Sequence, residues 1–147
     1  MPTPTSKITL REVTADTVRA ICNLATTDEQ RAFVAPNAVS IAQAHFSEHA
    51  WFRGIYADDD PVGFVMIDDQ PEKSEYFLWR FMLDTRYQRM GFGRQAMALI
   101  IEHVKSRPNA TVFLTSIHQA EGGPQKFYEK LGFVPIEVCN YYHFWIK

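Results

Sequence analysis

Hydrophobic and polar positions in the first third of the chain follow two different periods. Residues Lys7–Glu12 alternate between apolar and polar side chains, which predicts a strand. Residues Asp16–Leu24 repeat their apolar positions at helical spacing, which predicts a helix. Ser40 followed three residues later by Gln43 is typical of a capping box, so a second helix is expected to open at Ser40.

Apolar runs in the middle of the chain predict three strands and a helix. Trp51–Ala57 and Val62–Ile67 flank a run of turn-forming residues that begins at Asp58, which predicts a hairpin. Ser74–Leu83 is long and strongly aromatic, and it predicts a third strand. The segment after it has apolar side chains at positions i, i+3, i+4 and i+7, which predicts an amphipathic helix; these side chains are Met97, Ile100, Ile101 and Val104.

The last third of the chain predicts a strand, a short helix and a hairpin. Thr111–Ile117 is the strand. Pro124–Phe133 predicts a helix, because a proline stands near its start and Gly132 near its end. Phe127 and Leu131 lie four residues apart, on the expected buried side. The closing hairpin is expected from the two runs Val134–Val138 and Tyr142–Ile146. The predicted order is therefore β-α-α-β-β-β-α-β-α-β-β.

Composition narrows the class of protein. The 147 residues are enough for a substantial core, so residues 1–147 are expected to form a single domain. A hydrophobic content of 46% and an aromatic content of 14% exclude a disordered chain. The net charge of −2 gives no electrostatic reason to expect a nucleic acid or a membrane surface as partner.

The chain shows no targeting or metal-binding signal. No apolar run reaches about 18 residues, and Met1–Ser6 lacks the features of a signal peptide, so a cytoplasmic protein is expected. Cys22 and Cys139 give no disulfide framework and are expected to be buried thiols. Neither the cysteines nor the histidines have ligand spacing, so no metal is expected.

A glycine-containing loop carries the first chemical signal. Gln88–Arg94, which reads Gln-Arg-Met-Gly-Phe-Gly-Arg, joins the apolar run Tyr76–Leu83 to the predicted helix. Glycines let backbone N–H groups turn toward a ligand, and a helix start offers unpaired donors, so the loop predicts a phosphate site. It is not a P-loop, because Arg94 follows Gly93, nor a dinucleotide fingerprint, because Ala96 stands at the third glycine position. The pattern alone leaves a tight turn without a ligand open.

A second motif, about 40 residues further on, resolves the ambiguity by resemblance. Leu83–Gly93 looks like the acetyl-CoA motif of the GNAT superfamily of acyl-CoA-dependent N-acyltransferases, and Phe127–Phe133 looks like its C-terminal motif. The resemblance extends from about Lys7 to the end of the chain. It implies an α/β (α+β) fold with a mixed, mostly antiparallel sheet of about seven strands and about four helices.

The resemblance also implies where acetyl-CoA binds as cosubstrate. Backbone N–H groups of Met82 and Leu83 would engage the acetyl and pantetheine parts. The pyrophosphate would be cradled by the loop and helix start, which comprise Arg89, Met90, Gly91, Phe92, Gly93 and Arg94.

Tyr128 is the predicted general acid. Acylating an alkylamine requires loss of a proton from an ammonium of pKa about 10.4 and release of a thiolate whose thiol has a pKa of about 8.5. A phenol of pKa about 10 is a weaker acid than this thiol, so a hydrogen bond to the thiolate is expected to precede proton transfer. The family resemblance gives this tyrosine the same role, and an ordinary core or surface aromatic is the alternative.

Some positions depart from the family pattern. Glu121 stands where the family commonly has an asparagine that helps hold pantetheine, and Pro124 where it has alanine. The last part of the third long strand has no acidic residue to act as base. Arg80, expected by alternation to share a face with Leu78 and Met82, cannot replace it. The base is left open among a water chain and the side chains of Glu75, His118 and Glu121.

The acceptor side resembles the bacterial spermine/spermidine (diamine) acetyltransferase branch. The resemblance lies in Asp28–Ala44, in Trp79–Phe81 and in the closing hairpin. A polyamine site needs carboxylates spaced along a groove and aromatic walls for the methylenes. The candidates are Asp28, Glu29, Glu75 and Glu121, with Trp79, Tyr76 and Tyr141. The main hypothesis is therefore acetyl transfer to a primary amine of a small polyamine.

Two other functions stay open. The chain could acetylate a protein N-terminus or a lysine, which an exposed groove of peptide width would favour. It could also be a non-catalytic acyl-CoA-binding regulatory module; the intact loop and Tyr128 argue against this, and the missing acidic residue keeps it open. The aromatic run Tyr141–Trp145 could serve a homodimer contact or the core.

Overall fold

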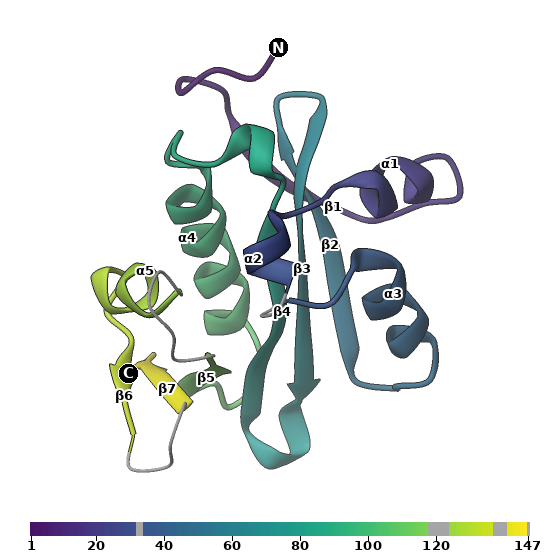
Figure 1. The fold of residues 1–147 in the computed structure, drawn as a ribbon. Helices are drawn as coiled ribbons and strands as arrows, with labels where there is room; N and C mark the ends of the chain where they lie inside the picture. Colours follow the sequence, from purple (N-terminus) through teal and green to yellow (C-terminus); the bar gives the residue numbers. More distant parts are fainter. Residues whose placement is uncertain (32–33, 118–123, 137–140, 147) are drawn as a thin grey trace.

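A mixed seven-stranded sheet forms the centre of the protein (Figure 1). The computed structural model describes residues 1–31, 34–117, 124–136 and 141–146, without the side chains of residues 29 and 31. The strand order is β1-β2-β3-β4-β5-β7-β6, and every neighbouring pair is antiparallel except β4 and β5. The predicted fold class is confirmed. The strands are β1 Ile8–Arg11, β2 Ala50–Ala57, β3 Asp60–Gln70, β4 Glu75–Leu83, β5 Val112–Ser116, β6 Val134–Pro135 and β7 Tyr141–Trp145.

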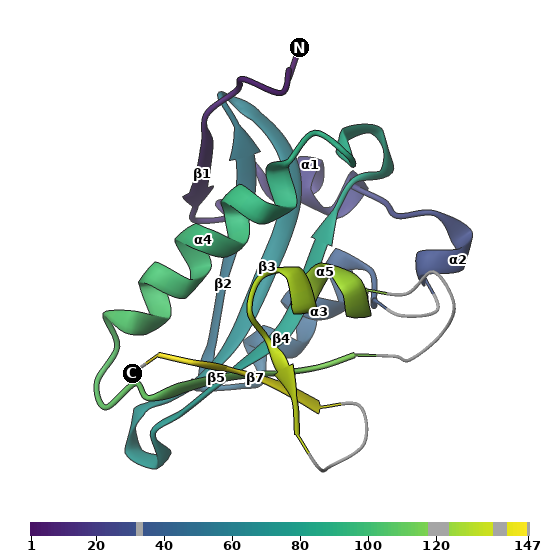
Figure 2. The same cartoon turned by 90° about the vertical axis from the view of Figure 1, so that its left-hand side faces the viewer.

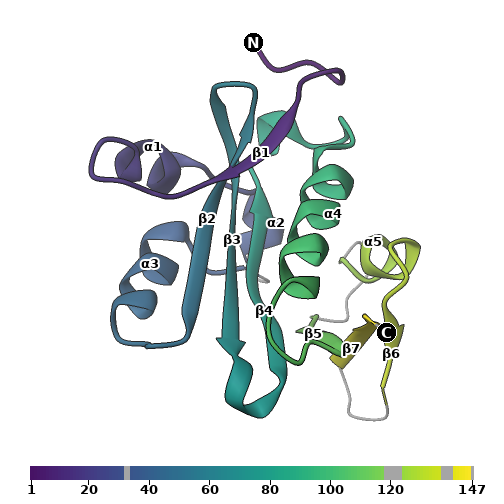
Figure 3. The ribbon, with the colours of Figure 1, turned by 180° about the vertical axis from the view of Figure 1, so that it is seen from behind.

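Helices cover both faces of the sheet. The long helix α4 lies along one face, and α1 and α3 lie on the opposite face (Figures 1 and 3). Helix α5 lies beside the C-terminal strands on the α4 side (Figure 2). The short helix α2 was not predicted. The helices are α1 Val18–Asn23, α2 Asp28–Arg31, α3 Asn37–His45, α4 Phe92–Lys105 and α5 Gln125–Lys130.

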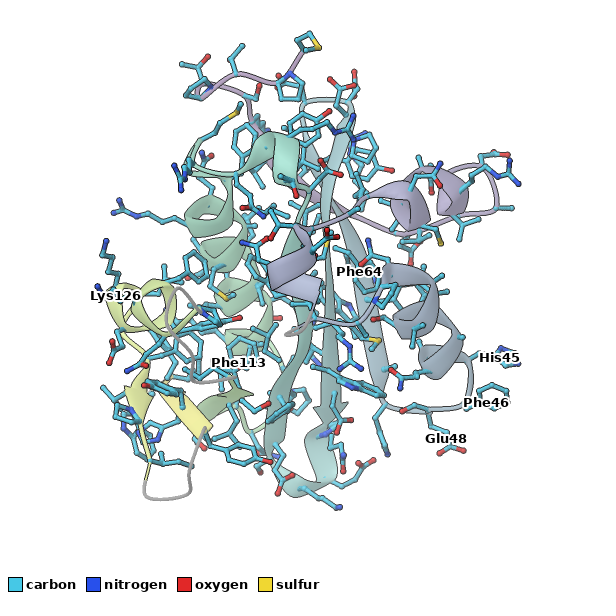
Figure 4. The ribbon with its side chains drawn as sticks, viewed as in Figure 1. His45, Phe46, Glu48, Phe64, Phe113 and Lys126 are labelled. Carbon is cyan, nitrogen blue, oxygen red and sulfur yellow. The ribbon has the colours of Figure 1, made fainter. Side chains whose placement is uncertain are left out.

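The central strand β3 is buried on both sides. Val65 and Ile67 belong to the core under α4, whereas Phe64 and Met66 belong to the core under α1 and α3. This is why the strand reads as a continuous apolar run rather than as an alternation. Figure 4 shows Phe64 on the α3 side, and Phe113 of β5 near α4 and α5.

A β-bulge divides strand β4. Met66 of β3 faces Arg80 and the next residue, Ile67, faces Leu78, so Trp79 is an extra residue on β4. As a result, Leu78 packs under α4 but Met82 packs under α1 and α3. The prediction that Arg80 shares one face with both was therefore wrong, because the bulge resets the alternation.

Helix α3 begins earlier than predicted. It starts at Asn37 with Pro36 as N-cap, and this N-terminus has no side-chain capping bond. Asn37 is buried and donates from Nδ2 to the Ile21 carbonyl oxygen at 2.8 Å. Ser40 lies inside the helix and is buried, so the predicted capping box at Ser40 was wrong. The fixed backbone torsion of a proline and a buried amide outweigh the local capping pattern.

The predicted C-terminal elements are confirmed with small changes. Helix α5 buries Tyr128, and Phe127 and Leu131 are partly buried against the same core. Strand β6 pairs with β7 as expected, and β7 lies between β5 and β6. β6 ends at Pro135, before Ile136, and positions 137 and 138 of the predicted run Val134–Val138 lie outside the described residues.

Candidate functional site

The candidate site lies where the two parallel strands separate. β4 and β5 pair only at Tyr76–Phe113, Phe77–Leu114 and Leu78–Thr115. Beyond Leu78, β4 continues along β3 alone, while β5 continues beside β7 (Figure 2). The change of direction coincides with the bulge at Trp79, because a bulge adds twist to its strand.

A cleft of about 610 Å³ opens at this separation. One wall is the second half of β4, residues 78–83, and the other is formed by residues 115–117 with Pro124, Phe127 and Tyr128. Since β5 no longer pairs with it there, this edge of β4 offers backbone donors and acceptors to an extended ligand. The predicted residues Met82 and Leu83 both lie in this wall.

The glycine loop closes one end of the cleft. Arg89 has φ +64° and Gly91 has φ +81°, so the chain makes two left-handed turns before α4 begins at Phe92. Gly91 is the N-cap and makes no side-chain capping bond, so the first N–H groups of α4 stay available. Arg89, Gly91, Gly93 and Arg94 line the cleft. The loop therefore presents a helix N-terminus and two arginines, which suits an anionic phosphate.

Glycine is needed at position 93 because of close packing, not because of its backbone conformation. A Cβ at this position would lie 3.2 Å from the Phe127 ring and 3.3 Å from Leu83 Cδ1. The missing side chain therefore lets the start of α4 approach both walls of the cleft closely. Phe92 is fully buried and Met90 packs against the same core, so these two predicted residues anchor the loop and do not line the cleft.

Asp84 fixes the start of the loop, although it was not among the site residues predicted from the sequence. Its buried carboxylate accepts hydrogen bonds from the Ala25 N–H at 2.9 Å, the Arg86 N–H at 3.0 Å and Arg86 Nε at 2.8 Å. Burial alone would raise the pKa of Asp84, but the bonds from Arg86 and Ala25 together lower it. An aspartate directly after a predicted strand is typical of an Asx-turn, in which its carboxylate accepts a hydrogen bond from the backbone N–H two residues later. This pattern could have identified Asp84 from the sequence.

Gln88 ties the loop to α2. Its Nε2 donates to the Leu83 carbonyl oxygen at 3.0 Å and to Gln30 Oε1 at 2.9 Å, and Gln30 Nε2 donates back to Gln88 Oε1 at 3.3 Å. Gln30 and Gln88 both line the cleft. The segment before α3 is therefore held against the loop by a reciprocal amide pair, and the sequence offered no local signal for this contact.

Tyr128 lies in the wall opposite β4. Its side chain is 7% exposed and lines the cleft. Burial raises the pKa of the phenol, and a hydrogen bond with the side chain of Thr115 opposes that rise. The phenol is therefore protonated at neutral pH, as a proton donor must be.

Trp79 and Arg80 line the cleft beside the bulge. Arg80 donates from Nη1 to the Trp79 carbonyl oxygen at 2.9 Å and from Nη2 to Gln43 Oε1 at 3.0 Å. Its Nε is buried without a hydrogen-bond partner among the described residues, and burial lowers the pKa of the guanidinium. In the described part of the lining no Asp or Glu is present.

The predicted acidic residues are not brought together in the described part of the site. Glu75 begins β4 at the end away from Leu83, is exposed, and does not line the cleft. Glu29 belongs to α2, and its side chain is outside the described atoms. Glu121 and His118 lie outside the described residues, so the identity of the base stays a prediction.

The described residues contain neither a cluster of metal ligands nor a membrane-spanning helix. Within residues 1–31, 34–117, 124–136 and 141–146, no group of three or more His, Cys, Asp or Glu side chains could hold a metal ion. In the same ranges no helix has the length and apolar character needed to cross a membrane.

Comparison with known proteins agrees with this geometry. A family model described as the acetyltransferase (GNAT) family matches residues 18–133. A spermine/spermidine N(1)-acetyltransferase of Bacillus subtilis is 27% identical over 132 residues, which cover 86% of this chain and 87% of the relative.

Solved structures share the fold. The ribosomal-protein-S18-alanine N-acetyltransferase of Escherichia coli superposes with a TM-score of 0.71 at 17% identity, covering 96% of this chain and 95% of the other. The PaiA N-acetyltransferase of Thermoplasma acidophilum, solved with coenzyme A, gives 0.65 at 16% identity, covering 93% and 96%.

Proposed function

The chain belongs to the GNAT acetyltransferase family, and on that premise we propose that it transfers the acetyl group of acetyl-CoA to a primary amine of a small polyamine. The observation that carries the proposal is the cleft at the separation of β4 and β5. It combines an open strand edge, an uncapped helix N-terminus and a buried phenol in one continuous space.

The residues present fit acetyl-CoA. The start of α4 and the loop from Arg89 to Arg94 would hold the pyrophosphate through backbone N–H groups, with Arg89 and Arg94 adding positive charge. The free edge of β4 at Met82 and Leu83 would bond the pantetheine amides and the acetyl carbonyl. Bound there, acetyl-CoA supplies an activated acyl carbon with a thiolate leaving group.

Tyr128 is the proposed acid for that leaving group. Nitrogen forms a bond to the acetyl carbon, the C–S bond breaks, and its electron pair stays on sulfur. Tyr128 hydrogen-bonds the sulfur and gives it the phenol proton, and solvent then reprotonates Tyr128. The nitrogen loses one proton from its ammonium form before it attacks and a second as the amide forms. His118, Glu121 and a water chain stay the candidate bases. The products are an N-acetylamine and a thiol.

The acceptor class is supported by the curated relative and by the shape of the site. The relative that acts on spermine and spermidine covers most of this chain. Trp79 lies in the cleft, where an indole can contact methylenes and an ammonium. Carboxylates for the distal ammonium groups would come from Glu29 and Glu121.

An acetylated protein N-terminus or lysine is the second candidate, and one observation favours it. The described lining contains Arg80, Arg89 and Arg94 but no acidic side chain, which suits a polycation less well than an acceptor with fewer positive charges.

The test is release of CoA from acetyl-CoA with a panel of spermine, spermidine, putrescine, free amino acids, and peptides with free N-termini or lysines. We expect amine-dependent turnover with spermine or spermidine and a decrease in kcat of roughly a hundredfold in Tyr128→Phe, the size of a lost general acid. Tyr141→Phe is the matched control, because this phenol is exposed on β7 and outside the cleft lining. Turnover with peptides alone would establish the second candidate instead.

A further inference from the structure

Arg80 places a positive charge in the cleft that no described acidic side chain neutralises. Of the arginines whose side chains are described, three are half-buried, namely Arg53, Arg80 and Arg107. Arg107 Nε lies 2.8 Å from the Asp69 carboxylate, and Arg53 Nη2 lies 3.8 Å from that of Glu12. Arg80 forms no ion pair with any described residue. A half-buried charge without a counter-charge is costly, so this position favours an anion.

The hydrogen bonds that Arg80 does form go to neutral groups. These are the Trp79 carbonyl oxygen and Gln43 Oε1, both described above. Nε is buried, and no described atom accepts from it. Because burial lowers the pKa of the guanidinium and no described carboxylate opposes that shift, the charge is poorly stabilised as it stands. A carboxylate in the cleft would supply both a counter-charge and further acceptors.

Arg80 lies apart from the other two arginines of the lining. Arg89 and Arg94 are exposed and belong to the loop and helix start that would hold the pyrophosphate. Arg80 lies beside the bulge, further back along the β4 wall, and its bond to Gln43 joins it to α3. α3 belongs to the segment in which the sequence places the acceptor side. The guanidinium is therefore positioned to contact the acceptor rather than the phosphates of the acyl donor.

We propose that Arg80 binds a carboxylate of the acceptor, so that the cleft takes primary amines that also carry a carboxylate in addition to polyamines. The inference rests on the proposed function and adds a substrate class to it. The planar guanidinium matches the two oxygens of a carboxylate, which a single ammonium group does not. The Trp79 ring, whose centroid lies 5.7 Å from Arg80 Cζ, is near enough to contact the methylenes of the same acceptor. The carboxylate is held but takes no part in acetyl transfer.

Matched acceptors test the inference, because ornithine is putrescine with an added carboxylate and lysine is cadaverine with one. We expect the unmodified chain to acetylate all four amines. In Arg80→Gln, kcat/KM for ornithine and lysine should fall roughly ten- to a hundredfold, as for lost hydrogen bonds to a charged group. For putrescine and cadaverine it should be equal or higher, because a charge that repels ammonium groups is removed.

Two further variants separate the charge of Arg80 from its contact with α3. Gln43→Ala removes that contact and keeps the guanidinium, so the ratio of kcat/KM for ornithine to that for putrescine should stay near its original value. Arg80→Lys keeps the charge but loses the planar fork, so this ratio should fall less than in Arg80→Gln. Thermal melting checks folding, and Arg80→Lys carries the test if Arg80→Gln does not fold.

A binding measurement does not depend on turnover. Calorimetric titration of ornithine into protein saturated with CoA should show binding that Arg80→Gln weakens roughly ten- to a hundredfold.

The two proposals fail in different ways. No turnover with any of these amines overturns the proposed function, and the calorimetric result then decides the inference. Turnover with the diamines but not with ornithine or lysine overturns the inference. An equal loss for all four amines in Arg80→Gln, or the same loss for ornithine in Gln43→Ala, overturns it as well.

Discussion

The two halves of strand β4 share one backbone but have different surroundings. From Tyr76 to Leu78 the strand pairs with β3 on one side and β5 on the other, and Tyr76 and Leu78 are buried under α4. From Arg80 to Leu83 it pairs with β3 alone, and with Trp79 this half forms a wall of the cleft. The first half is a structural element of the core, and the second half is the edge that we propose binds the ligand.

The bulge at Trp79 is what separates these roles. The extra residue shifts the alternation of side chains, so that positions before and after it which would share a face of the sheet lie on opposite faces. It coincides with the separation of β5 from β4. A binding edge is thereby obtained within a central strand, where an unpaired edge would otherwise be costly. Substitutions on the two sides of the bulge should therefore change different measured quantities.

The largest effect on stability is expected in the structural half. Tyr76→Ala removes a fully buried ring and should lower the free energy of unfolding by about 3–5 kcal/mol, measured by urea denaturation. Tyr76→Phe keeps the ring and loses only the bond from its hydroxyl to the Pro108 carbonyl, so about 1 kcal/mol is expected. Neither should change the affinity of the folded protein for acetyl-CoA. A weakened affinity in Tyr76→Phe would show that the halves are coupled.

Gly63→Ala should disturb the binding half. Gly63 faces Leu83, and a Cβ there would lie 2.4 Å from the Met82 carbonyl oxygen, so β4 must move away from β3. The expected cost is about 2–3 kcal/mol of stability, together with weaker acetyl-CoA binding in calorimetry. Gly54→Ala is the control, because its Cβ would meet side-chain ends of Ile21 and Tyr56 outside the cleft lining. Equal loss of affinity in both variants would contradict the assignment.

Asp84→Asn should act on stability in a pH-dependent manner. At pH 7 a cost of roughly 1–2 kcal/mol is expected from the weakened bonds to Ala25 and Arg86. Because the pKa of Asp84 is lowered in the folded protein, its stabilisation is complete above about pH 4 and is lost as the pH falls through the lower folded pKa. Melting curves of wild type and variant should converge on acidification. A constant difference between them would refute ionic stabilisation by Asp84, and the exposed Asp59→Asn should change little at pH 7.

Gly91→Ala should have the smallest effect on stability. Its φ of +81° strains any residue with a Cβ, by about 1 kcal/mol, although the space beside it is open. Gly91→Asn should cost less, because asparagine tolerates this backbone conformation. Acetyl-CoA affinity should follow the same order. Equal affinities in all three proteins would mean that the turn at Gly91 does not shape the phosphate site.

Patterns local to one segment were predictable from the sequence. The strands, the helix α4, the glycine loop and the short helix around Tyr128 each rest on neighbouring residues, and the structure contains all of them. The bulge was not predictable, because residues 76–83 are apolar on both faces except at Arg80, so no break in period marks Trp79.

Contacts between distant segments also escaped prediction. The bond from Ala25 to Asp84 spans 59 residues, and that between Gln30 and Gln88 spans 58. Nothing near either end of such a bond specifies its partner. The placement of Tyr128 in the wall opposite β4 depends in the same way on contacts between distant segments. The expected single domain, cytoplasmic location and homodimer stay predictions of the sequence.

The amide pair of Gln30 and Gln88 has a consequence for how acceptor specificity can be altered. It links the segment before α3 to the phosphate loop, which also depends on Asp84 through Ala25. Under the proposed function, selectivity for the amine and binding of the acyl donor therefore cannot be altered independently. A chimera in which residues 24–36 come from a relative must also carry that relative's side chains at positions 84 and 88. Otherwise we expect the chimera to lose binding of the acyl donor as well as binding of the original acceptor.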